Sequence, residues 1–400
     1  MRELPKILGL AILLTVVASS PGAAAPKTGI PESAAADSFV LAEVAAEKPR
    51  RVPRVPWLTD KSWPEVLDQA HTADQPVLID FTATWCGPCK LLDVMVFTEK
   101  PVISELAEVV TMQVDIDKPE YLQLKTDFAV EVVPTLVWCN QRGEEIDRFT
   151  GYVSSAQFMT IVQGWRGNRT IDRVLGERQS ASPEDPAMLL DVARRQAERG
   201  KDREADVLYR RLMNLRHEAD PRLVARGMLG LAEMEHRFGR EEEARHLARR
   251  VAALYTSEDA PASVVTYRNE GMMEAALFQE SIGDTLGMLN TFRTLAEADH
   301  RNALALHGYA RAAVQTGIDL VPATRSAIRA VVYSDNDPDV MSTLAACYYW
   351  RGLYSKAIKW QRKSVDAAPH QKLYRAQLAL YEDAKAADPH GMRGPPKRNR

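Results

Sequence analysis

The sequence has few cysteines, little net charge and only one long apolar run, and each shortage excludes a class of protein. Four cysteines in 400 residues are too few for a disulfide-dense secreted scaffold. Fifty-one lysines and arginines against 54 acidic residues give a formal net charge of −3, which excludes a protein drawn to nucleic acid by its overall charge. The apolar run begins at residue 7, and one such run excludes a multi-span membrane protein. The length and the 46% hydrophobic content instead predict two or three domains with real cores.

The first 25 residues have the pattern of a secretory signal peptide. Arg2 and Lys6 give a positive start, residues 7–18 an apolar core, and residues 23–25 three small side chains suited to cleavage. This core of twelve residues is shorter than a bilayer span, which takes roughly 20. We therefore predict cleavage after Ala25 and export to a bacterial periplasm, where disulfide chemistry can occur. The alternative is an uncleaved membrane anchor.

Two segments have neither a helical nor a strand pattern. Residues 26–56 are rich in alanine, proline and glutamate, and proline at three of the last eight positions blocks a helix. They predict a disordered linker whose basic cluster is either solvated or in contact with phospholipid headgroups. Residues 388–400 are basic and rich in proline and glycine, and they predict a disordered tail.

Residues 57–167 have the pattern of an α/β domain. A nearly all-apolar run at residues 77–81 predicts a central strand buried on both faces. Apolar patterns further along the chain predict other strands and two helices. The strands are expected at 109–116, 135–139 and 144–149, and the helices near 63–70 and 158–165.

The chemistry is expected at a Cys-x-x-Cys motif that follows the predicted central strand and opens a helix. The unpaired N–H groups and the dipole of a helix start favour a thiolate, so Cys86 is predicted to be the nucleophile. Cys89, one turn further on, can attack a mixed disulfide and release the substrate. Pro88 fixes the turn between them, and Gly87 lets a substrate backbone approach. Lys90, beside the helix start, is expected to be either solvated or functional.

A lone Cys-x-x-Cys can also be half of a zinc site, which requires a second pair of ligands. Cys139 and Cys347 lie 208 residues apart, and neither has a nearby histidine in the sequence. We therefore predict no metal site and a redox-active disulfide between Cys86 and Cys89. Cys139 and Cys347 are expected to be buried apolar side chains.

These motifs together resemble the thioredoxin family. The resemblance is carried by the Trp-Cys-Gly-Pro-Cys-Lys segment at 85–90 after Asp80, by Val-Pro-Thr at 133–135 and by Gly151, and it covers residues 57–167. The segment after the second cysteine is longer than in thioredoxin itself. It is more similar to the periplasmic C-terminal domain of the membrane thiol:disulfide interchange reductase.

The resemblance implies roles for residues around the two cysteines. Pro134 matches the family's cis-proline, beside which the backbone of Val133 pairs with a bound substrate strand. Asp80 matches the family's buried acid, whose raised pKa lets it take the proton of Cys89; the alternative is a strand residue exposing its carboxyl at a sheet edge. The substrate-positioning residues are expected to be Trp85, Gly87, Pro88 and Val133.

The sequence departs from the family at one position of the predicted site. Gln113 stands where thioredoxin has a lysine facing the buried acid. Without that cation, proton transfer through Asp80 is expected to be slower. The Gly-Pro pair between the cysteines implies a reducing poise, and an exported reductase of this kind takes its electrons from a donor, commonly a membrane-embedded one. No cofactor is implied.

Residues 185–387 predict an all-α helical repeat domain. A small residue, a glycine and then an alanine recur with glycines at 200, 239, 283, 317 and 352. Spacings of 39, 44, 34 and 35 residues are typical of stacked helix pairs. The last copy resembles a tetratricopeptide (TPR) repeat, and four or five repeats are expected. The alternative is an irregular helical bundle.

Arrays of this kind usually present a concave groove to a peptide or protein. Tyr349 and Trp350 are predicted to be partner-binding residues in that groove, because core packing accounts for one aromatic there more easily than for two adjacent ones. The leading prediction is therefore an exported thiol–disulfide oxidoreductase that reduces protein disulfides and binds clients or partners through its repeats. The alternatives are a TPR-type scaffold with an accessory redox domain, and an isomerase or chaperone-like exchanger.

Overall fold

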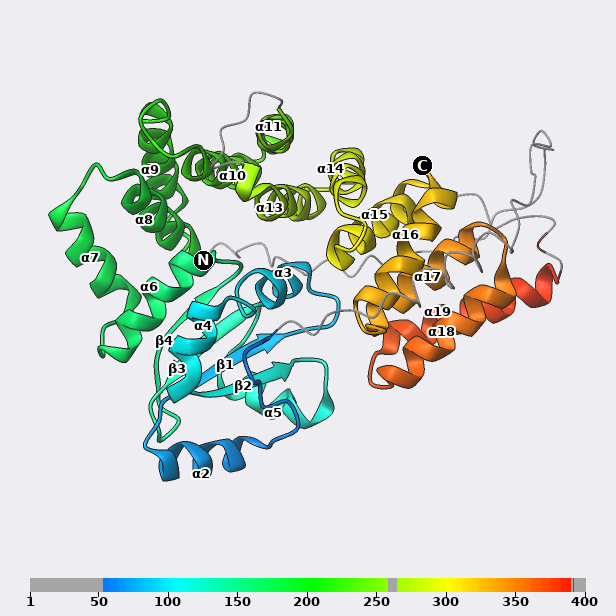
Figure 1. Ribbon diagram of the computed structural model, residues 1–400, viewed down its shortest axis with the longest axis horizontal. Coiled ribbons are helices and arrows are strands. Elements are labelled where there is room, and N and C mark those ends of the chain that lie inside the picture. Colours follow the sequence, from blue (N-terminus) through cyan, green and yellow to red (C-terminus); the bar gives the residue numbers. More distant parts are fainter. Residues whose placement is uncertain (1–52, 258–264, 390, 392–400) are drawn as a thin grey trace, which may run out of the picture.

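The computed structural model describes residues 53–257, 265–389 and 391. The predicted signal peptide, nearly all of the predicted linker and most of the predicted tail lie outside these residues. Among the helices of the described part, none is long and apolar enough to cross a membrane. The predicted fold class, an α/β unit followed by an all-α repeat, is confirmed (Figure 1).

The α/β unit is built on a four-stranded mixed sheet with the strand order β2-β1-β3-β4. Strand β1 is parallel to β2 and antiparallel to β3, which pairs with β4 in turn. The strands are β1 (Val77–Thr82), β2 (Val110–Asp115), β3 (Thr135–Cys139) and β4 (Glu145–Thr150). All four predicted strands are therefore present, with bounds shifted by a residue at some ends.

Helices cover both faces of this sheet because β1 buries side chains on both. Ile79 and Phe81 point into one core with α2 and α5, whereas Leu78 points into the other with α3, α4 and α6 (Figure 1). The helices of the unit are α2 (Trp63–Ala73), α3 (Gly87–Met95), α4 (Lys100–Glu105), α5 (Leu122–Asp127) and α6 (Ser155–Arg166). Short 3₁₀ turns at Leu106–Glu108 and Pro119–Tyr121 complete it.

The folded body begins before residue 57, where the predicted linker ends. Val55 is buried, and its N–H donates to the carbonyl of Phe97 at 3.0 Å. Leu58 then forms a parallel bridge with Met112 on β2. The last residues of the predicted linker therefore pack against the α/β unit, because the apolar side chain of Val55 is buried in its core.

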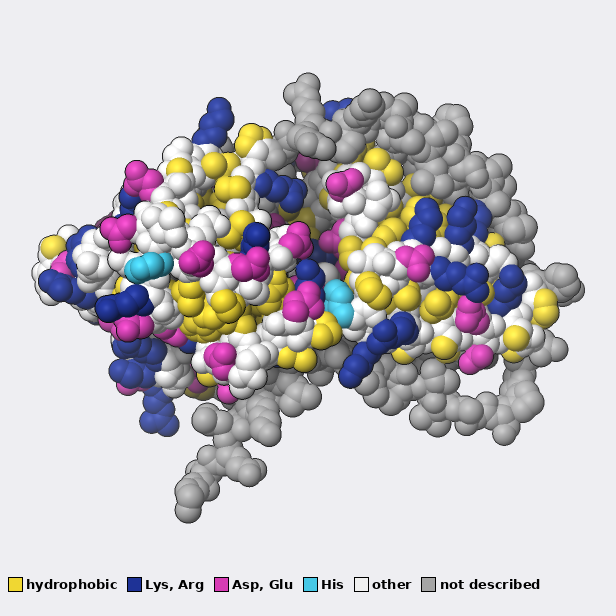
Figure 2. Space-filling view, turned by 90° about the horizontal axis from the view of Figure 1, so that it is seen from below, with side chains coloured by type: hydrophobic (Ala, Val, Ile, Leu, Met, Phe, Trp, Pro, Cys, Tyr) yellow, Lys and Arg dark blue, Asp and Glu magenta, His cyan; other side chains and the backbone are white. Residues whose placement is uncertain are grey.

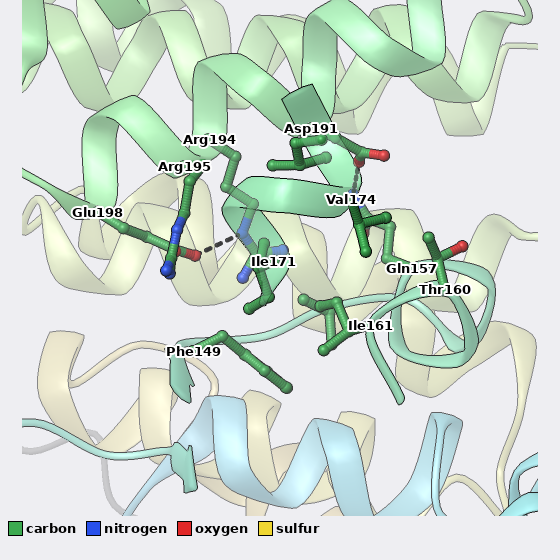
Figure 3. Close-up of a pocket in the computed structure, with 12 residues that line it drawn as sticks. Phe149, Gln157, Thr160, Ile161, Ile171, Val174, Asp191, Arg194, Arg195 and Glu198 are labelled. Carbon is green, nitrogen blue, oxygen red and sulfur yellow. Dashed lines mark hydrogen bonds and ion pairs between the residues drawn. The ribbon is translucent and has the colours of Figure 1, made fainter. Parts of the chain in front are cut away.

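The segment between the two predicted domains is a helix rather than a loop. Helix α7 (Ile171–Ala181) is followed by α8 (Pro186–Glu198), and Met188 and Val192 of α8 belong to the core of the α/β unit. A pocket between β4, α6, α7 and α8 is lined by apolar side chains, by Gln157 and Thr160 of α6, and by four charged residues of α8, Asp191, Arg194, Arg195 and Glu198 (Figure 3). The first helix of the array is thus shared between both halves.

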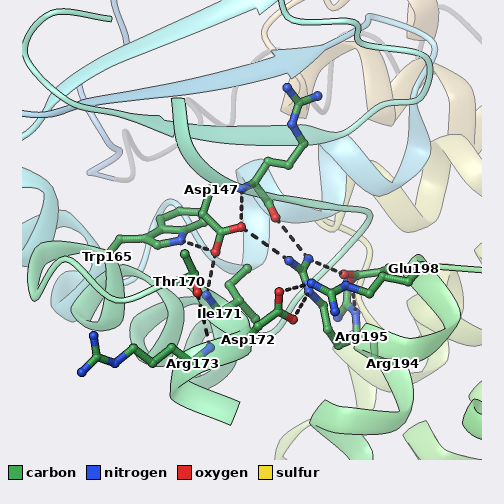
Figure 4. Close-up of polar contacts among 11 residues, drawn as sticks. Asp147, Trp165, Thr170, Ile171, Asp172, Arg173, Arg194, Arg195 and Glu198 are labelled. Carbon is green, nitrogen blue, oxygen red and sulfur yellow. Dashed lines mark hydrogen bonds and ion pairs between the residues drawn. The ribbon is translucent and has the colours of Figure 1, made fainter. Parts of the chain in front are cut away.

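A polar network fixes this junction. Asp147 on β4 accepts hydrogen bonds from the indole of Trp165, the N–H of Ile171 and the guanidinium of Arg195, at 3.1, 2.6 and 3.4 Å (Figure 4). Arg195 also donates to Asp172 at 3.1 Å. Since Asp147 and Arg195 are both largely buried, charge-assisted bonds of this kind hold α7 and α8 against the sheet.

The helical array, residues 186–387 except 258–264, contains five consecutive helix pairs in the described residues. Each pair turns at one of the five predicted glycines, whose φ angles lie between 69° and 78°, a region that glycine enters without steric cost. The pairs are α8 with α9 (Asp202–Asn214), α10 (Pro221–Arg237) with α11 (Glu241–Thr256), α13 (Arg268–Ser281) with α14 (Thr285–Ala298), α15 (Ala303–Thr316) with α16 (Leu320–Tyr333), and α17 (Pro338–Trp350) with α18 (Tyr354–Ala367).

Small residues let the helices of the array approach closely. Ala193, Ala205, Ala345 and Ala357, all in the predicted repeat pattern, are fully buried. A final helix, α19 (Lys372–Ala387), packs on α18 and ends the array. On the face seen from below, hydrophobic side chains gather over the α/β unit and lysines and arginines over α18 and α19 (Figure 2).

Candidate active site

The two cysteines of the motif lie where β1 leads into α3, and they are joined in a disulfide. Cys86 is the N-cap of α3, and its Sγ accepts a hydrogen bond from the N–H of Cys89 at 3.2 Å. Gly87 and Pro88 occupy the first turn, where proline needs no hydrogen-bond partner. The helix start therefore directs an N–H at the sulfur of Cys86, an arrangement that favours the thiolate when the pair is reduced.

The second predicted element of the site is the loop before β3. The Val133–Pro134 peptide bond is cis, and the hydroxyl of Thr135 donates to the carbonyl of Val132 at 2.7 Å. Val132 is 46% exposed, and Trp85, next to Cys86 in the sequence, is 44% exposed. Two exposed apolar side chains therefore lie on the loops that carry Cys86 and Pro134.

Asp80 lies in the middle of the sheet, not at an edge, since β1 has a strand on each side. Its side chain is buried, and burial raises its pKa to about 7. The nearby charge of Asp93 raises the pKa further, while a hydrogen bond from Gln113 at 3.0 Å opposes both effects. The second oxygen of Asp80 has no hydrogen-bond partner among the described residues. The edge alternative is therefore wrong, and the carboxyl is poised to hold or release a proton near neutral pH.

Sequence reasoning missed a second acid beside this one. The amide of Gln113 donates to Oδ1 of Asp93 at 3.2 Å as well as to Asp80, so one glutamine bridges two carboxyl groups. Burial raises the pKa of Asp93 to about 6. The available signal was its place four residues after Cys89, which puts both on one side of α3.

The helical array contacts the first turn of α3 directly. A Cβ added to Gly87 would lie 2.6 Å from a methyl carbon of Leu277 on α13, so the leucine rests against the glycine that follows Cys86. One turn on, the ammonium of Lys90 lies 2.9 Å from Asp339 and 3.4 Å from Asp337, at the start of α17. Lys90 is therefore neither solvated nor free, and the array supplies its partners.

A second set of contacts joins the site to the end of the array. One carboxylate oxygen of Asp117 accepts hydrogen bonds from the indole of Trp85 at 2.7 Å and from the amide of Gln371 at 2.8 Å. The hydroxyls of Thr84 and Tyr374 are 3.5 Å apart. Residues at the start of α19 thus reach the loop that carries Cys86.

The predicted partner-binding role of Tyr349 is wrong. Tyr349 is only 4% exposed, and its ring stacks on that of Tyr381 with centroids 4.7 Å apart. The reason is α19, which covers the face predicted to form the groove. Trp350 is partly buried and packs edge-on against Tyr349 at 5.4 Å, so it belongs to the same aromatic cluster.

Cys139 and Cys347 are fully buried and not disulfide-bonded. Burial raises the pKa of both thiols to about 12, which keeps them protonated and unreactive. Their predicted role as apolar core residues is confirmed.

The family model for thioredoxin matches residues 54–164. Mitochondrial thioredoxin from Bos taurus is 36% identical over 100 residues, which are 25% of this chain and 57% of that protein. Thioredoxin H-type 1 from Nicotiana tabacum is 30% identical over 107 residues, which are 26% of this chain and 77% of that protein. The chain belongs to the thioredoxin family.

The thioredoxin domain carries the cysteine pair of a thiol–disulfide oxidoreductase, as predicted. A thiol:disulfide interchange protein from Campylobacter jejuni is 29% identical over 101 residues, which are 25% of this chain and 18% of that protein. The solved structure of YrrB, a TPR protein with an unusual peptide-binding site, covers 52% of this chain and 97% of its own, with 12% identity and a TM-score of 0.38. The chain spans little more than half the length of the mitochondrial thioredoxins it matches.

Proposed function

We propose that this protein is an exported thiol–disulfide oxidoreductase that reduces disulfides of protein clients through Cys86 and Cys89. One observation carries the proposal: the cysteine pair lies at the start of α3, and β1, the strand that leads into α3, holds the buried carboxyl of Asp80, whose pKa is about 7. A nucleophile at a helix start and a proton acceptor titrating near neutral pH are the two groups that thiol–disulfide exchange needs.

The reaction proceeds in two exchange steps. The Cys86 thiolate attacks one sulfur of the client disulfide, forming a mixed disulfide, and the other client sulfur leaves as a thiolate that takes a proton from water. Cys89 gives its proton to Asp80 and attacks Cys86, which releases the second client thiol and forms the Cys86–Cys89 disulfide. Two electrons pass to the client, and a dithiol donor must return them.

The donor is proposed to be a membrane-embedded dithiol protein. An exported reductase works in an oxidising compartment, where no soluble thiol pool keeps it reduced. The similarity to a thiol:disulfide interchange protein supports exchange with another dithiol protein, and the resemblance of the segment after Cys89 to a periplasmic reductase domain favours a membrane-embedded one. Its test is reduction of the Cys86–Cys89 disulfide by membranes of the source organism, followed by thiol labelling.

A disulfide-bonded unstructured peptide with dithiothreitol as electron donor tests the activity. The protein is expected to accelerate reduction of the peptide, and Cys86→Ser to abolish the acceleration. Cys139→Ser is the matched control, because that thiol is buried and protonated. Full activity in the Cys86→Ser variant would show that the assigned nucleophile is wrong.

Export is proposed from the pattern of residues 1–25 alone. Cell fractionation with N-terminal sequencing tests it, and a mature chain beginning at residue 26 in the periplasmic fraction is expected. A chain that keeps residues 1–25 in the membrane fraction would favour the uncleaved anchor.

The scaffold alternative assigns the main role to the array. It is disfavoured because α13, α17 and α19 turn side chains toward the thioredoxin domain of the same chain. If the peptide assay shows no Cys86-dependent reduction, the scaffold role becomes the better explanation.

A further inference from the structure

Three separate helices of the array meet the thioredoxin domain around its active site. Helix α13 packs on α3, the start of α17 pairs with Lys90, and the start of α19 reaches Asp117 and Thr84 (Figure 1). Three of the contacted residues, Thr84, Gly87 and Lys90, lie within four positions of Cys86, and Asp117 is hydrogen-bonded to Trp85. The array therefore borders the nucleophile rather than an unrelated face.

Access to the nucleophile is narrow in this arrangement. Cys86 is only 3% exposed. Leu277 of α13 covers Gly87, so a protein that approaches Cys86 from this side would have to displace α13. Gln371 and Tyr374 bound it at the preceding loop, through Asp117 and Thr84.

One side of the rim stays open. Trp85 and Val132, on the two loops that form the site, are both exposed. An extended chain segment or a small molecule needs to contact only these two loops to reach Cys86. The convex surface of a folded protein would also have to clear α13 and α19, which contact the residues on either side of Cys86.

Charged and polar contacts hold the array in place. Lys90 and Asp339 each keep only 16% of their side-chain surface exposed, and His307 lies 3.7 Å from the same carboxylate. Burial lowers the pKa of His307 to about 3, so the histidine is neutral and hydrogen-bonds Thr343 at 2.9 Å. In any other arrangement of the two halves that keeps these groups buried, each charge would lose its partner, so the pair favours the arrangement seen here.

We propose that the helical array is a steric selectivity element for the active site: disulfides on small molecules and on extended chain segments reach Cys86, whereas disulfides on the surface of folded proteins do not. The inference rests on the proposed function. Leu277, Gln371 and Tyr374 are the residues that set the limit, and they act by position rather than by touching reacting atoms.

The first experiment needs no variant. The full chain and a stand-alone thioredoxin are compared on three substrates: glutathione disulfide, an unstructured peptide with one disulfide, and a folded protein with one exposed disulfide that the stand-alone thioredoxin reduces. The ratio of folded-protein to peptide reduction is expected to be about tenfold lower for the full chain. Equal ratios would overturn the proposal.

The second experiment loosens the contact at Gly87. Leu277→Arg places a charge against α3 and is expected to raise the folded-protein rate by about tenfold while the glutathione disulfide rate changes by less than about twofold. Leu286→Arg, at an exposed leucine of α14, is the matched control and should change neither rate. If Leu277→Arg raises both rates equally or neither, the array does not select by size.

Glutathione disulfide separates this proposal from the proposed function. If the full chain reduces glutathione disulfide and the folded protein in the same ratio as a stand-alone thioredoxin, only the selectivity is wrong. If it reduces none of the three substrates, the oxidoreductase function fails, and the selectivity fails with it.

Discussion

The ammonium of Lys90 lies 2.9 Å from a carboxylate oxygen of Asp339, although 249 residues separate them in the chain. Burial disfavours the charge on Lys90, but Asp339 and Asp337 outweigh that effect and raise its pKa. Burial likewise opposes the charge on Asp339, yet the cation of Lys90 holds the pKa of that carboxyl at about 2. The residue directly after Cys89 is thus fixed by the far half of the molecule.

Lys90→Met should destabilise the protein because it leaves two acidic side chains without their cation. We expect the free energy of unfolding to fall by about 3–5 kcal/mol. Thermal and denaturant unfolding of the full chain measure it. Lys100→Met, at an exposed lysine of α4, should cost less than about 0.5 kcal/mol. Equal costs for the two variants would show that the pair contributes nothing.

Asp80→Asn should stabilise the protein at alkaline pH. The pKa of Asp80 is raised in the fold, so its contribution to stability is fully present below the unfolded value and is lost as pH rises through about 7. The variant removes this loss. At pH 8 its free energy of unfolding should therefore be about 4 kcal/mol higher than that of the wild type. Denaturant titrations from pH 4 to 8 measure the difference.

Asp60→Asn is the control for that series, because Asp60 is exposed. Asp93, whose pKa of about 6 is also raised by burial, adds a pH dependence of its own to the wild-type curve. A stability curve of Asp80→Asn that runs parallel to the wild type would contradict the raised pKa of Asp80.

Cys89→Ser should accumulate mixed disulfides, because Cys86 still attacks a substrate while nothing resolves the adduct. Incubation with a disulfide-bonded peptide and non-reducing mass spectrometry detect the adduct. The double variant Cys86→Ser/Cys89→Ser should form none. Adducts of similar yield in both variants would place the reactive sulfur elsewhere.

Tyr349→Ala should destabilise the end of the array. Because Tyr349 is buried, the variant should not lose a contact with a client. Removing a buried ring costs about 3–5 kcal/mol. Tyr349→Phe keeps the stack on Tyr381 and should cost about 1 kcal/mol or less. Hydrogen exchange over α17 and α19 locates the change, and an unaltered exchange pattern in Tyr349→Ala would argue against a structural role.

The repeat and the strands were predictable because each leaves a local pattern. The repeat glycines at 200, 239, 283, 317 and 352 each reverse the chain in a left-handed conformation, so the period of the repeat is visible in the sequence as their spacing. Likewise, a run buried on both faces, such as β1, is apolar except at Asp80 and at the less buried Thr82 that ends it.

The docking of the array on the active site was not predictable, because its residues have ordinary local roles. Asp337 precedes Pro338 and caps α17, and its sequence context indicates nothing beyond this capping role. Leu277 is one more apolar residue on a helix. Tyr349 was misassigned for a related reason: a buried aromatic and a groove aromatic have the same helical spacing, and only the position of α19 distinguishes them.

Thr84 and Tyr374, which contact each other in the folded protein, are synthesised at different times. They are 290 residues apart, with the active site made early and α19 made last. At a synthesis rate of 5–20 residues per second, the cysteine loop exists for roughly 15–60 s before its final neighbours emerge. During that interval a newly made thioredoxin domain lacks the border that α19 later provides, so a nascent molecule and a finished one differ in what surrounds the same two sulfur atoms.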